Sequence, residues 1–494
     1  MGGFEKNESS QDEAGSNSAD FPLDPDANLP QEERRKIERK LMLKIDLVLI
    51  PWLCLLYLLA FLDRTNIGNA KVAGLTGDLH LTTGQYNTAL TLFFVSYSVF
   101  EPLTNVLLKK LRPSIFIPAT MFFWGASMTG MGFCYNYSGI LAARWFLGLA
   151  EAGLFPGINY YLSCWYKRSE FGIRAAIFFS SAALAGSFGG LLAAAIQKLD
   201  GRGGLAGWRW IFVLEGLLTI VVSVVSFWMV HDFPAEARFL SQEDRDRVTF
   251  RLKMDQQSSA EREWNTSYLY AGLKDWKMWL GMIVYMGCDM PLYAFSLFLP
   301  TIIESSGWGT SVVKTNLLSV PPYAAAAVLT VIIGVVADRT RQRGLCNIVV
   351  SVIGIVGFIL LVASDNPAVQ YAGTFLGALG IYPCIANTIT WMANNTEGVY
   401  KRGVVLGFVI GWGNLNGIVS SNIFFDPPRY FQGHGVIIAY MALFLFGGSV
   451  VMTTLLRIEN KKRREGKRDY LAEGKSEAEL ESMGDARPDF IYTT

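Results

Sequence analysis

Twelve long apolar segments dominate this chain of 494 residues and leave few folds open to it. Each is roughly 17–25 residues long, the length that an α-helix needs to cross a bilayer. A helix satisfies its backbone polar groups internally, as hydrocarbon requires, and the alternating segments typical of a membrane barrel are absent. The pattern predicts an all-α polytopic membrane protein with spans at 45–65, 86–108, 115–134, 139–162, 174–197, 208–230, 278–299, 313–336, 346–363, 369–391, 402–423 and 434–456.

The charged residues are few and are confined to particular stretches. They make up 17% of the chain, against about 25% in an average soluble domain. The 43 basic and 42 acidic residues nearly cancel, so no global attraction to nucleic acid is expected. Their positions divide the chain into a disordered cytoplasmic tail at 1–44, a six-helix bundle at 45–230, a cytoplasmic loop at 231–277, a second six-helix bundle at 278–456 and a cytoplasmic tail at 457–494.

Basic residues are concentrated in alternate loops. Such loops face the cytoplasm in helical membrane proteins, which places both termini and the central loop on the cytoplasmic side. These loops carry Lys109, Lys110, Arg112, Lys167, Arg168, Arg174, Arg339, Arg341, Arg343, Lys401 and Arg402.

The two bundles share a weak internal repeat. Both FLGLAEAGLFPGINYYLSCWYKRSEFGIR (146–174) and FLGALGIYPCIANTITWMANNTEGVYKR (375–402) place a proline near mid-helix, followed by a tryptophan and a basic loop. Two pseudo-symmetric six-helix halves are typical of transporters that bind their substrate between the halves.

Several motifs carry a family resemblance. GVVADRTRQRG, from Gly334 to Gly344, resembles the loop signature of the major facilitator superfamily, whereas the equivalent first-half loop, NVLLKKLRPS, lacks the aspartate. LDRTNIGNAK, RWFLGLAEAGLFPG, GWRWIFVLEG, DFPAEARFLSQEDR, WMANNTEGVYKRG and FDPPRYFQGHG together resemble the fungal allantoate-permease-like branch of the anion:cation symporter family. The resemblance covers residues 40–460.

This resemblance implies the major facilitator fold and proton-coupled import of a small organic anion by alternating access. Known members carry carboxylates such as nicotinate, pantothenate, biotin and allantoate. The proton gradient would supply the energy without a cofactor, and the expected location is the plasma membrane. No oligomerisation signal is evident, so we expect a monomer whose partners are lipid, protons and the anion. The alternative on the same fold is export of a metabolite by proton antiport.

Ionisable side chains inside spanning helices are costly and therefore mark candidate functional positions. Arg64 offers a fixed fork of donors that suits a carboxylate, and Asp63 beside it could take up a proton. The resemblance favours these roles, because an Asp-Arg pair recurs in the first helix of the family. The alternative is an Asp–Arg pair at the end of the helix, at the membrane interface.

Arg144 and Glu151 are seven residues apart, about two turns, so they share one face of the fourth span. A substrate bound at Arg144 would compete for the arginine and change the proton affinity of Glu151. The resemblance, with an arginine and a glutamate in the fourth helix of the family, favours substrate binding by Arg144 and proton coupling by Glu151. The alternative is a structural ion pair.

The remaining ionisable residues of the spans leave more than one role open. Asp289, in the seventh span beside Pro291, is a proton-coupling candidate or the partner of a residue across the bundle. Glu101 is assigned a gating or structural role near the cytoplasmic end of the second span. Arg209 and Glu215, at the start of the sixth span, are interpreted in the same way.

Two asparagines, Asn387 and Asn414, are candidate substrate contacts. Amides in membrane helices more often hydrogen-bond a neighbouring helix, so helix packing is the alternative role. Tyr160, Phe188 and Trp412 could stack on an aromatic ligand, although core packing is the commoner role of such side chains.

Asp338, Arg339 and Arg343 belong to the loop signature. In major facilitators this loop joins the cytoplasmic ends of helices through charge pairs and helix dipoles, so the resemblance implies a gating role. A loop that is merely positive would explain the arginines but not Asp338.

Sequence signatures of enzymes and metal sites are missing. The three histidines, His80, His231 and His434, form no HExxH motif, and neither a G-x-S-x-G elbow nor a Walker loop is present. The six cysteines occur singly, without metal-ligand spacing. We therefore expect a transporter without catalytic residues or a metal.

Overall fold

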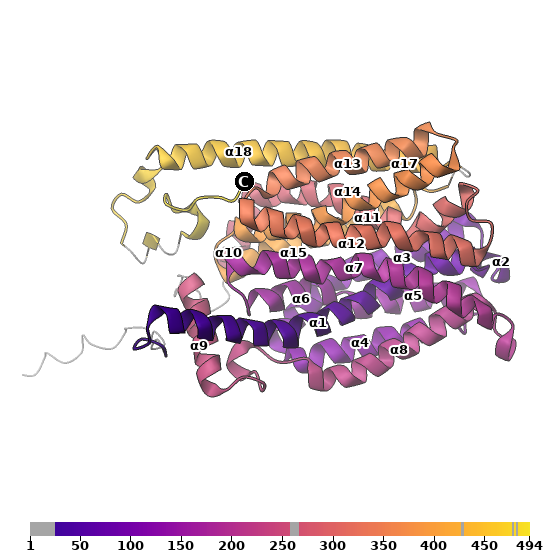
Figure 1. Cartoon of the computed structure of the whole chain (residues 1–494), viewed down its shortest axis with the longest axis horizontal. Helices are drawn as coiled ribbons and strands as arrows, with labels where there is room; N and C mark the ends of the chain where they lie inside the picture. The colour runs from indigo at the N-terminus through magenta and orange to yellow at the C-terminus, as the bar shows by residue number, and fades with distance from the viewer. Residues whose placement is uncertain (1–24, 257–265, 426–428, 477–478, 481–482) are drawn as a thin grey trace, which may run out of the picture.

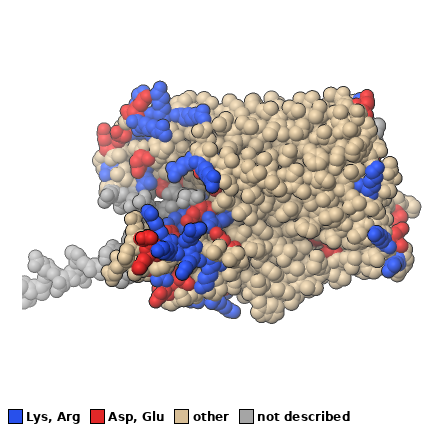
Figure 2. Space-filling view, viewed as in Figure 1, with Lys and Arg blue, Asp and Glu red and all other residues tan. Residues whose placement is uncertain are grey.

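The computed structural model describes residues 25–256, 266–425, 429–476, 479–480 and 483–494. The long helices run side by side along the long axis of the molecule (Figure 1). Lys, Arg, Asp and Glu gather at its two ends, most densely at the end where α9 lies, and the flank between them is almost free of charge (Figure 2). Such a belt suits contact with lipid, and we refer to the end that holds α9 as the cytoplasmic end.

Six spans form the N-terminal half. They are α1 (Gln31–Val72), α3 (Thr83–Lys110), α4 (Pro113–Met131), α5 (Tyr137–Glu151) continued by α6 (Leu154–Ser163), α7 (Arg168–Ile196) and α8 (Gly207–Met229). The short α2 (Leu75–Asp78) follows α1, and α9 (Gln242–Gln256) and α10 (Thr266–Leu273) lie in the central loop.

Six further spans form the C-terminal half. They are α11 (Trp276–Ser305), α12 (Val312–Thr340), α13 (Arg343–Ala363), α14 (Pro367–Asn394), α15 (Val399–Leu415) with α16 (Gly417–Ser420), and α17 (Phe431–Ala439) continued through the π-helical Tyr440–Gly447 into α18 (Gly448–Arg464). In the described chain, ten helices are long and apolar enough to cross a membrane. With α3 and α4, of 28 and 19 residues, they confirm the predicted six-plus-six architecture.

The first helix begins earlier than its apolar segment. It starts at Gln31, so the prediction of disorder is wrong for residues 31–44, whereas residues 1–24 lie outside the described part of the chain. The polar helical extension is held by α9, where Arg251 pairs with Glu38 at 2.6 Å and Asp244 pairs with Lys44 at 3.2 Å. Hydropathy detects only the part of a helix that faces lipid or core, and this extension is stabilised by charge instead.

Two spans are interrupted beside polar residues. The fourth span breaks between Glu151 and Leu154, where Pro156 has no N–H to donate to the carbonyl of Ala152 one turn earlier. The eleventh span breaks after Leu415, within the glycine-rich GWGNLNG. Both interruptions lie deep in the bundle, where irregular backbone is tolerated only if protein surrounds it.

The two halves pack closely through small residues. A methyl group on Gly68 of α1 would overlap the carbonyl oxygen of Leu297 on α11, and one on Gly417 would overlap the ring of Phe94 on α3. Glycine permits such close helix contacts because it has no side chain. Both contacts lie toward the end opposite α9, so the halves are closed against each other on that side.

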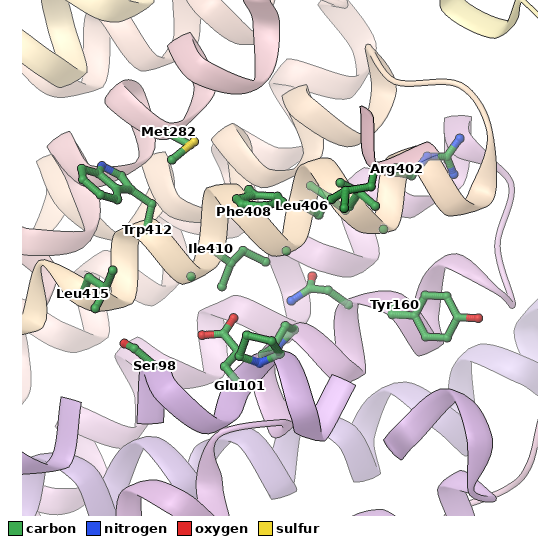
Figure 3. Close-up of a pocket in the computed structure, with 18 of the residues that line it drawn as sticks. Ser98, Glu101, Tyr160, Met282, Arg402, Leu406, Phe408, Ile410, Trp412 and Leu415 are labelled. Carbon is green, nitrogen blue, oxygen red and sulfur yellow. The ribbon is translucent and has the colours of Figure 1, made fainter. Parts of the chain in front are cut away.

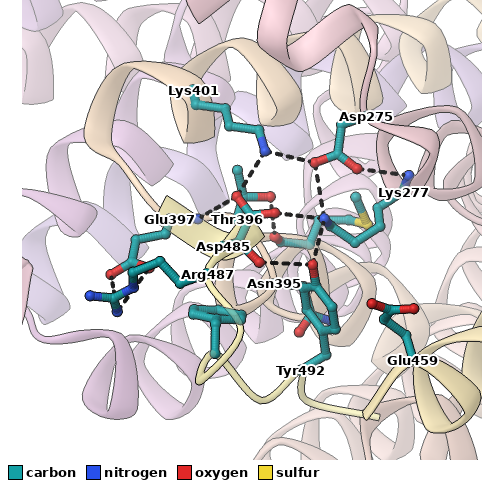
Figure 4. Close-up of polar contacts among 12 residues, drawn as sticks. Asp275, Lys277, Asn395, Thr396, Glu397, Lys401, Glu459, Asp485, Arg487 and Tyr492 are labelled. Carbon is teal, nitrogen blue, oxygen red and sulfur yellow. Dashed lines mark hydrogen bonds and ion pairs between the residues drawn. The ribbon is translucent and has the colours of Figure 1, made fainter. Parts of the chain in front are cut away.

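The predicted C-terminal tail includes an ordered segment, residues 485–493, which we call the C-terminal clasp (Figure 4). Its Asp485 carboxylate lies 2.7 Å from the ammonium groups of both Lys277 on α11 and Lys401 on α15. Asp275 pairs with the same two lysines, at 3.0 and 2.9 Å. Two carboxylates and two ammonium groups therefore join the cytoplasmic ends of α11 and α15.

The end of the clasp contacts two other spans. The carbonyl of Thr493 accepts hydrogen bonds from Trp391 Nε1 at 2.8 Å and from Asn395 Nδ2 at 2.9 Å, at the end of α14. The guanidinium carbon of Arg463 on α18 lies 4.3 Å from the centroid of the Tyr492 ring. The clasp thus connects four spans of the C-terminal half.

Candidate functional site

Arg64 lies at the centre of the bundle and contacts both halves. Its Nε donates to Glu151 Oε1 at 3.1 Å, and its Nη2 forms an ion pair with the same oxygen. Its Nη1 donates to the hydroxyl of Tyr293, on α11 of the other half, at 2.7 Å. The arginine therefore ties α1 to the broken fourth span and, across the interface, to α11.

The hydrogen-bonded chain continues from Tyr293. The Tyr293 hydroxyl donates to Asn414 Oδ1 at 2.7 Å, and Asn414 Nδ2 donates to Glu101 Oε2 at 2.9 Å. The chain, which we call the Arg64–Glu101 chain, starts and ends in the N-terminal half and passes through the C-terminal half between. Any movement of one half relative to the other must break it.

Aromatic rings surround this chain. The guanidinium carbon of Arg64 lies 4.8 to 5.4 Å from the ring centroids of Phe93, Tyr97 and Tyr293. Such rings attract a cation and exclude water, which strengthens the electrostatic interactions of the arginine.

Arg144 is fully buried and has spare donors. Its Nε donates to the carbonyl of Ala89 at 3.4 Å, but among the described residues neither Nη1 nor Nη2 has a hydrogen-bond partner. Its guanidinium carbon lies 4.8 Å from the centroid of Phe93, the ring that also faces Arg64. A buried charge without an acceptor is costly, so this arrangement suits an anion that arrives from outside the protein.

Glu151 pairs with Arg64 on α1. It does not pair with Arg144 on its own helix, so the structural ion pair considered for Arg144 and Glu151 is not formed. Asp63 is likewise not paired with its neighbour Arg64, because successive residues on a helix point in different directions. It faces the interior of the N-terminal half, where Asp63 Oδ2 accepts from Trp124 Nε1 at 3.1 Å and from the Thr219 hydroxyl at 2.9 Å. Asp63 and Arg64 are both buried and lie about two turns before α1 ends at Val72, so they do not form the pair at the end of the helix that was the alternative.

Asp289 is buried on α11, and its Oδ2 has no hydrogen-bond partner in the described part of the chain. A methyl group on Gly413 of α15 would lie 2.9 Å from this oxygen. Tyr293 follows Asp289 by one turn, so both side chains lie on the face of α11 that meets α15. Sequence reasoning missed Tyr293, although this spacing from Asp289 could have indicated it.

A cavity of about 610 Å³ lies between α3, α6 and α15 and reaches the Arg64–Glu101 chain (Figure 3). Glu101 lines one wall, with Phe408 and Ile410 opposite, while Tyr160 and Arg402 lie toward the cytoplasmic end. Glu101 thus faces the cavity with one oxygen unpaired among the described residues. Of the predicted aromatic contacts, Tyr160 and Trp412 line this cavity, whereas Phe188 is half exposed on α7 and does not.

The loop signature forms a separate polar cluster at the cytoplasmic end. Asp338 and Arg343 form an ion pair, and Arg343 Nη1 donates to Asn387 Oδ1 at 3.0 Å. The Asn387 amide donates to the Arg343 carbonyl and to Asn347 Oδ1, both at 2.8 Å. The structure therefore places Asn387, a predicted substrate contact, in this cluster with Arg343 and not beside Arg64, while Arg339 is exposed.

Comparison with known proteins identifies the fold and the family. The sequence profile described as Major Facilitator Superfamily matches residues 53–421. The chain belongs to this superfamily. An "uncharacterized transporter" of Schizosaccharomyces pombe is 36% identical over 87% of this chain and 86% of its own. The "high-affinity nicotinic acid transporter" of Saccharomyces cerevisiae is 32% identical over 87% of this chain and 80% of its own.

Among solved structures, a bacterial homolog of the human lysosomal transporter Spinster, in an inward-facing and unoccupied conformation, matches with a TM-score of 0.61. The two are 15% identical, and the match covers 83% of this chain and 94% of that chain. The family profile and the relatives identify the chain as a multi-pass membrane transporter of the major facilitator superfamily, and the structural match shows the fold.

A substitution at Gly172 tests the predicted gating role of the loop that contains Asp338 and Arg343. A methyl group on Gly172 of α7 would overlap the Asp338 carboxylate and the Arg343 guanidinium, which ties α7 to the α12–α13 corner. We expect Gly172→Ala to separate the halves at this edge and to lower the transport rate roughly fivefold, a shift of about 1 kcal/mol between states. Electron–electron resonance distances between spin labels on α7 and α12 should lengthen.

Gly130→Ala is the matched control, because a methyl group there would meet nothing within 4 Å. Unchanged α7–α12 distances in Gly172→Ala would show that this contact does not hold the halves together.

Proposed function

We propose that this transporter imports a small organic anion together with protons by alternating access, without a cofactor, as a monomer in the plasma membrane. The observation that carries the proposal is Arg144, a buried guanidinium beside the Arg64–Glu151 ion pair, with two nitrogens that have no hydrogen-bond partner among the described residues. A carboxylate is the natural complement of a guanidinium fork. The nicotinic acid transporter among the relatives supports this substrate class.

The geometry suggests how proton and anion could be coupled. A carboxylate that enters beside Phe93 can bind Arg144 and also attract Arg64, whose guanidinium faces the same ring. When Arg64 turns toward the substrate, Glu151 loses its cationic partner in a site that excludes water. A carboxylate in that position takes up a proton more readily, so binding of the anion and of the proton favour each other.

The same change of partner by Arg64 allows the two halves to move. Once Arg64 leaves Tyr293, the Arg64–Glu101 chain is broken at its first link between the halves. The halves are then free to rock around the bound substrate, and the cavity beside Glu101 offers the route toward the cytoplasm. Asp289 and Glu101, both with an unpaired oxygen in the described chain, are the further acids along this route.

Uptake into proteoliposomes tests the proposal. Labelled nicotinate, pantothenate, biotin and allantoate are offered with and without an inward proton gradient. We expect one of these carboxylates to accumulate several-fold more with the gradient. Glu151→Gln should still exchange this anion across the membrane but should no longer respond to the gradient, because the residue that takes up the proton is gone.

Uptake that is equal with and without the gradient would refute proton symport. Faster efflux of substrate from preloaded vesicles under an inward gradient would indicate the exporting alternative.

A further inference from the structure

Two buried acids face each other inside the N-terminal half, away from the cavity. Asp63 on α1 and Glu215 on α8 are 0% and 2% exposed. The Thr219 hydroxyl donates to Asp63 Oδ2, and Asn66 Nδ2 donates to Glu215 Oε2. Since Asn66 follows Asp63 by one turn and Thr219 follows Glu215 by one turn, the antiparallel helices place the two carboxyl groups about one turn, roughly 5 Å, apart.

No cation is paired with either acid in the described part of the chain. The groups that donate to it are an indole, a hydroxyl and an amide, all neutral, and no described Lys or Arg forms an ion pair with either acid. The helices around the pair add none: α4 carries no charged residue, Arg209 of α8 donates to the carbonyl of Gly132, Arg64 of α1 is turned to Glu151, and the charged residues of α7 lie in its first two turns. Glu151 of α5 is a further acid.

Two buried carboxylates this close, with no cation paired to either among the described residues, are not both ionised. Asp63 Oδ1 and Glu215 Oε1 are also buried, with no hydrogen-bond partner among the described residues. We infer that Asp63 and Glu215 bind one proton between them, which we call the shared proton, so that only one of the two is ionised, and that Glu215 is a second proton-binding residue of the transport cycle. The second part rests on the proposed proton coupling.

The position of the pair links it to the substrate site. Asp63 directly precedes Arg64 on α1, so the pair lies next in sequence to the Arg64–Glu151 ion pair. The negative charge of Glu151 opposes ionisation of Asp63, and this opposition disappears when Glu151 binds its own proton. Protonation of Glu151 therefore weakens the hold of the pair on its proton and changes the pH at which that proton is bound.

Infrared spectroscopy of the purified full-length protein tests the shared proton without any substrate. We expect the wild type to show the C=O band of a protonated carboxylic acid, shifted in Glu215→Gln and in Asp63→Asn and missing in the double variant. Ser223→Ala, one turn further along α8, is the control and should leave the band unchanged, because its hydroxyl bonds only to the Ile220 carbonyl of its own helix. Should Glu215→Gln fail to fold, Asn66→Ala removes the amide donor and should shift the same band.

Gradient-driven uptake tests the role in the cycle. We expect Glu215→Gln to shift the pH midpoint of uptake, whereas a merely structural residue would change the amount of folded protein and leave the midpoint in place. A band that is identical in the wild type and in the double variant would overturn the shared proton. An unshifted midpoint would overturn the role of Glu215. If the band behaves as expected but wild-type uptake ignores the gradient, the proposed symport fails and the shared proton stands.

Discussion

Arg144→Ala should abolish accumulation of the transported anion, and Arg144→Lys should weaken its binding by about 10- to 100-fold. The unpaired Nη1 and Nη2 of Arg144 can hold both oxygens of a carboxylate, whereas lysine offers only a point charge. Loss of one charge-assisted hydrogen bond costs about 1.5–3 kcal/mol, and each 1.4 kcal/mol is tenfold in affinity. Binding of the labelled anion to purified protein measures the effect.

Arg209→Lys is the matched control. Arg209 is also a buried arginine of the N-terminal half, but its Nη1 donates to the carbonyl of Gly132, far from the Arg64–Glu101 chain. Its replacement should leave the affinity for the anion within a factor of two or so. If Arg144→Lys bound the anion as tightly as the wild type does, Arg144 would not be the anion site.

Asp485→Asn should destabilise the C-terminal half by about 3 kcal/mol, the cost of breaking a buried ion pair. The substitution leaves Lys277 and Lys401 with Asp275 as their shared carboxylate. Burial alone would raise the pKa of Asp485, but the two ammonium groups lower it below its ordinary value of 3.8. Thermal unfolding in detergent measures the loss.

The lowered pKa of Asp485 also determines how the stability contributed by this residue depends on pH. A carboxylate with a depressed pKa in the folded protein contributes its full stability above the unfolded value and loses it as the pH falls through the folded value. The difference between wild type and Asp485→Asn should therefore be largest near neutral pH and shrink in acid below about pH 4. Asp489→Asn, which removes an exposed carboxylate of the same segment, should change neither the stability nor its pH dependence. Equal losses of stability in Asp485→Asn and Asp489→Asn would contradict the role of Asp485.

The span architecture could be predicted because lipid imposes it directly on composition. Each span must be apolar, so twelve apolar segments predict twelve spans. The ends of helices are less well determined by hydropathy, as α1 shows: residues 31–44 are polar, yet they are helical because α9 supplies their charged partners. The clasp was equally inaccessible, since Asp485 meets Lys277 from 208 residues away.

The site residues could be found individually but not as pairs. Arg64, Arg144 and Glu151 stand out because charge inside a span is rare. Their partners depend on how α1 and α5 face each other in the bundle, and hydropathy does not show that Glu151 meets Arg64. Tyr293 was missed because a tyrosine in an apolar segment carries no charge, although it is the bridge between the halves.

The clasp has a consequence for the order in which the protein is made. Lys277 and Lys401 leave the ribosome long before residues 485–493, so for that interval two ammonium groups share the single carboxylate of Asp275. All twelve spans can be inserted by then, but the charge at the cytoplasmic ends of α11 and α15 is not yet balanced. A chain that stops before Asp485 would therefore contain all twelve spans but only one carboxylate for the two lysines that join the cytoplasmic ends of α11 and α15.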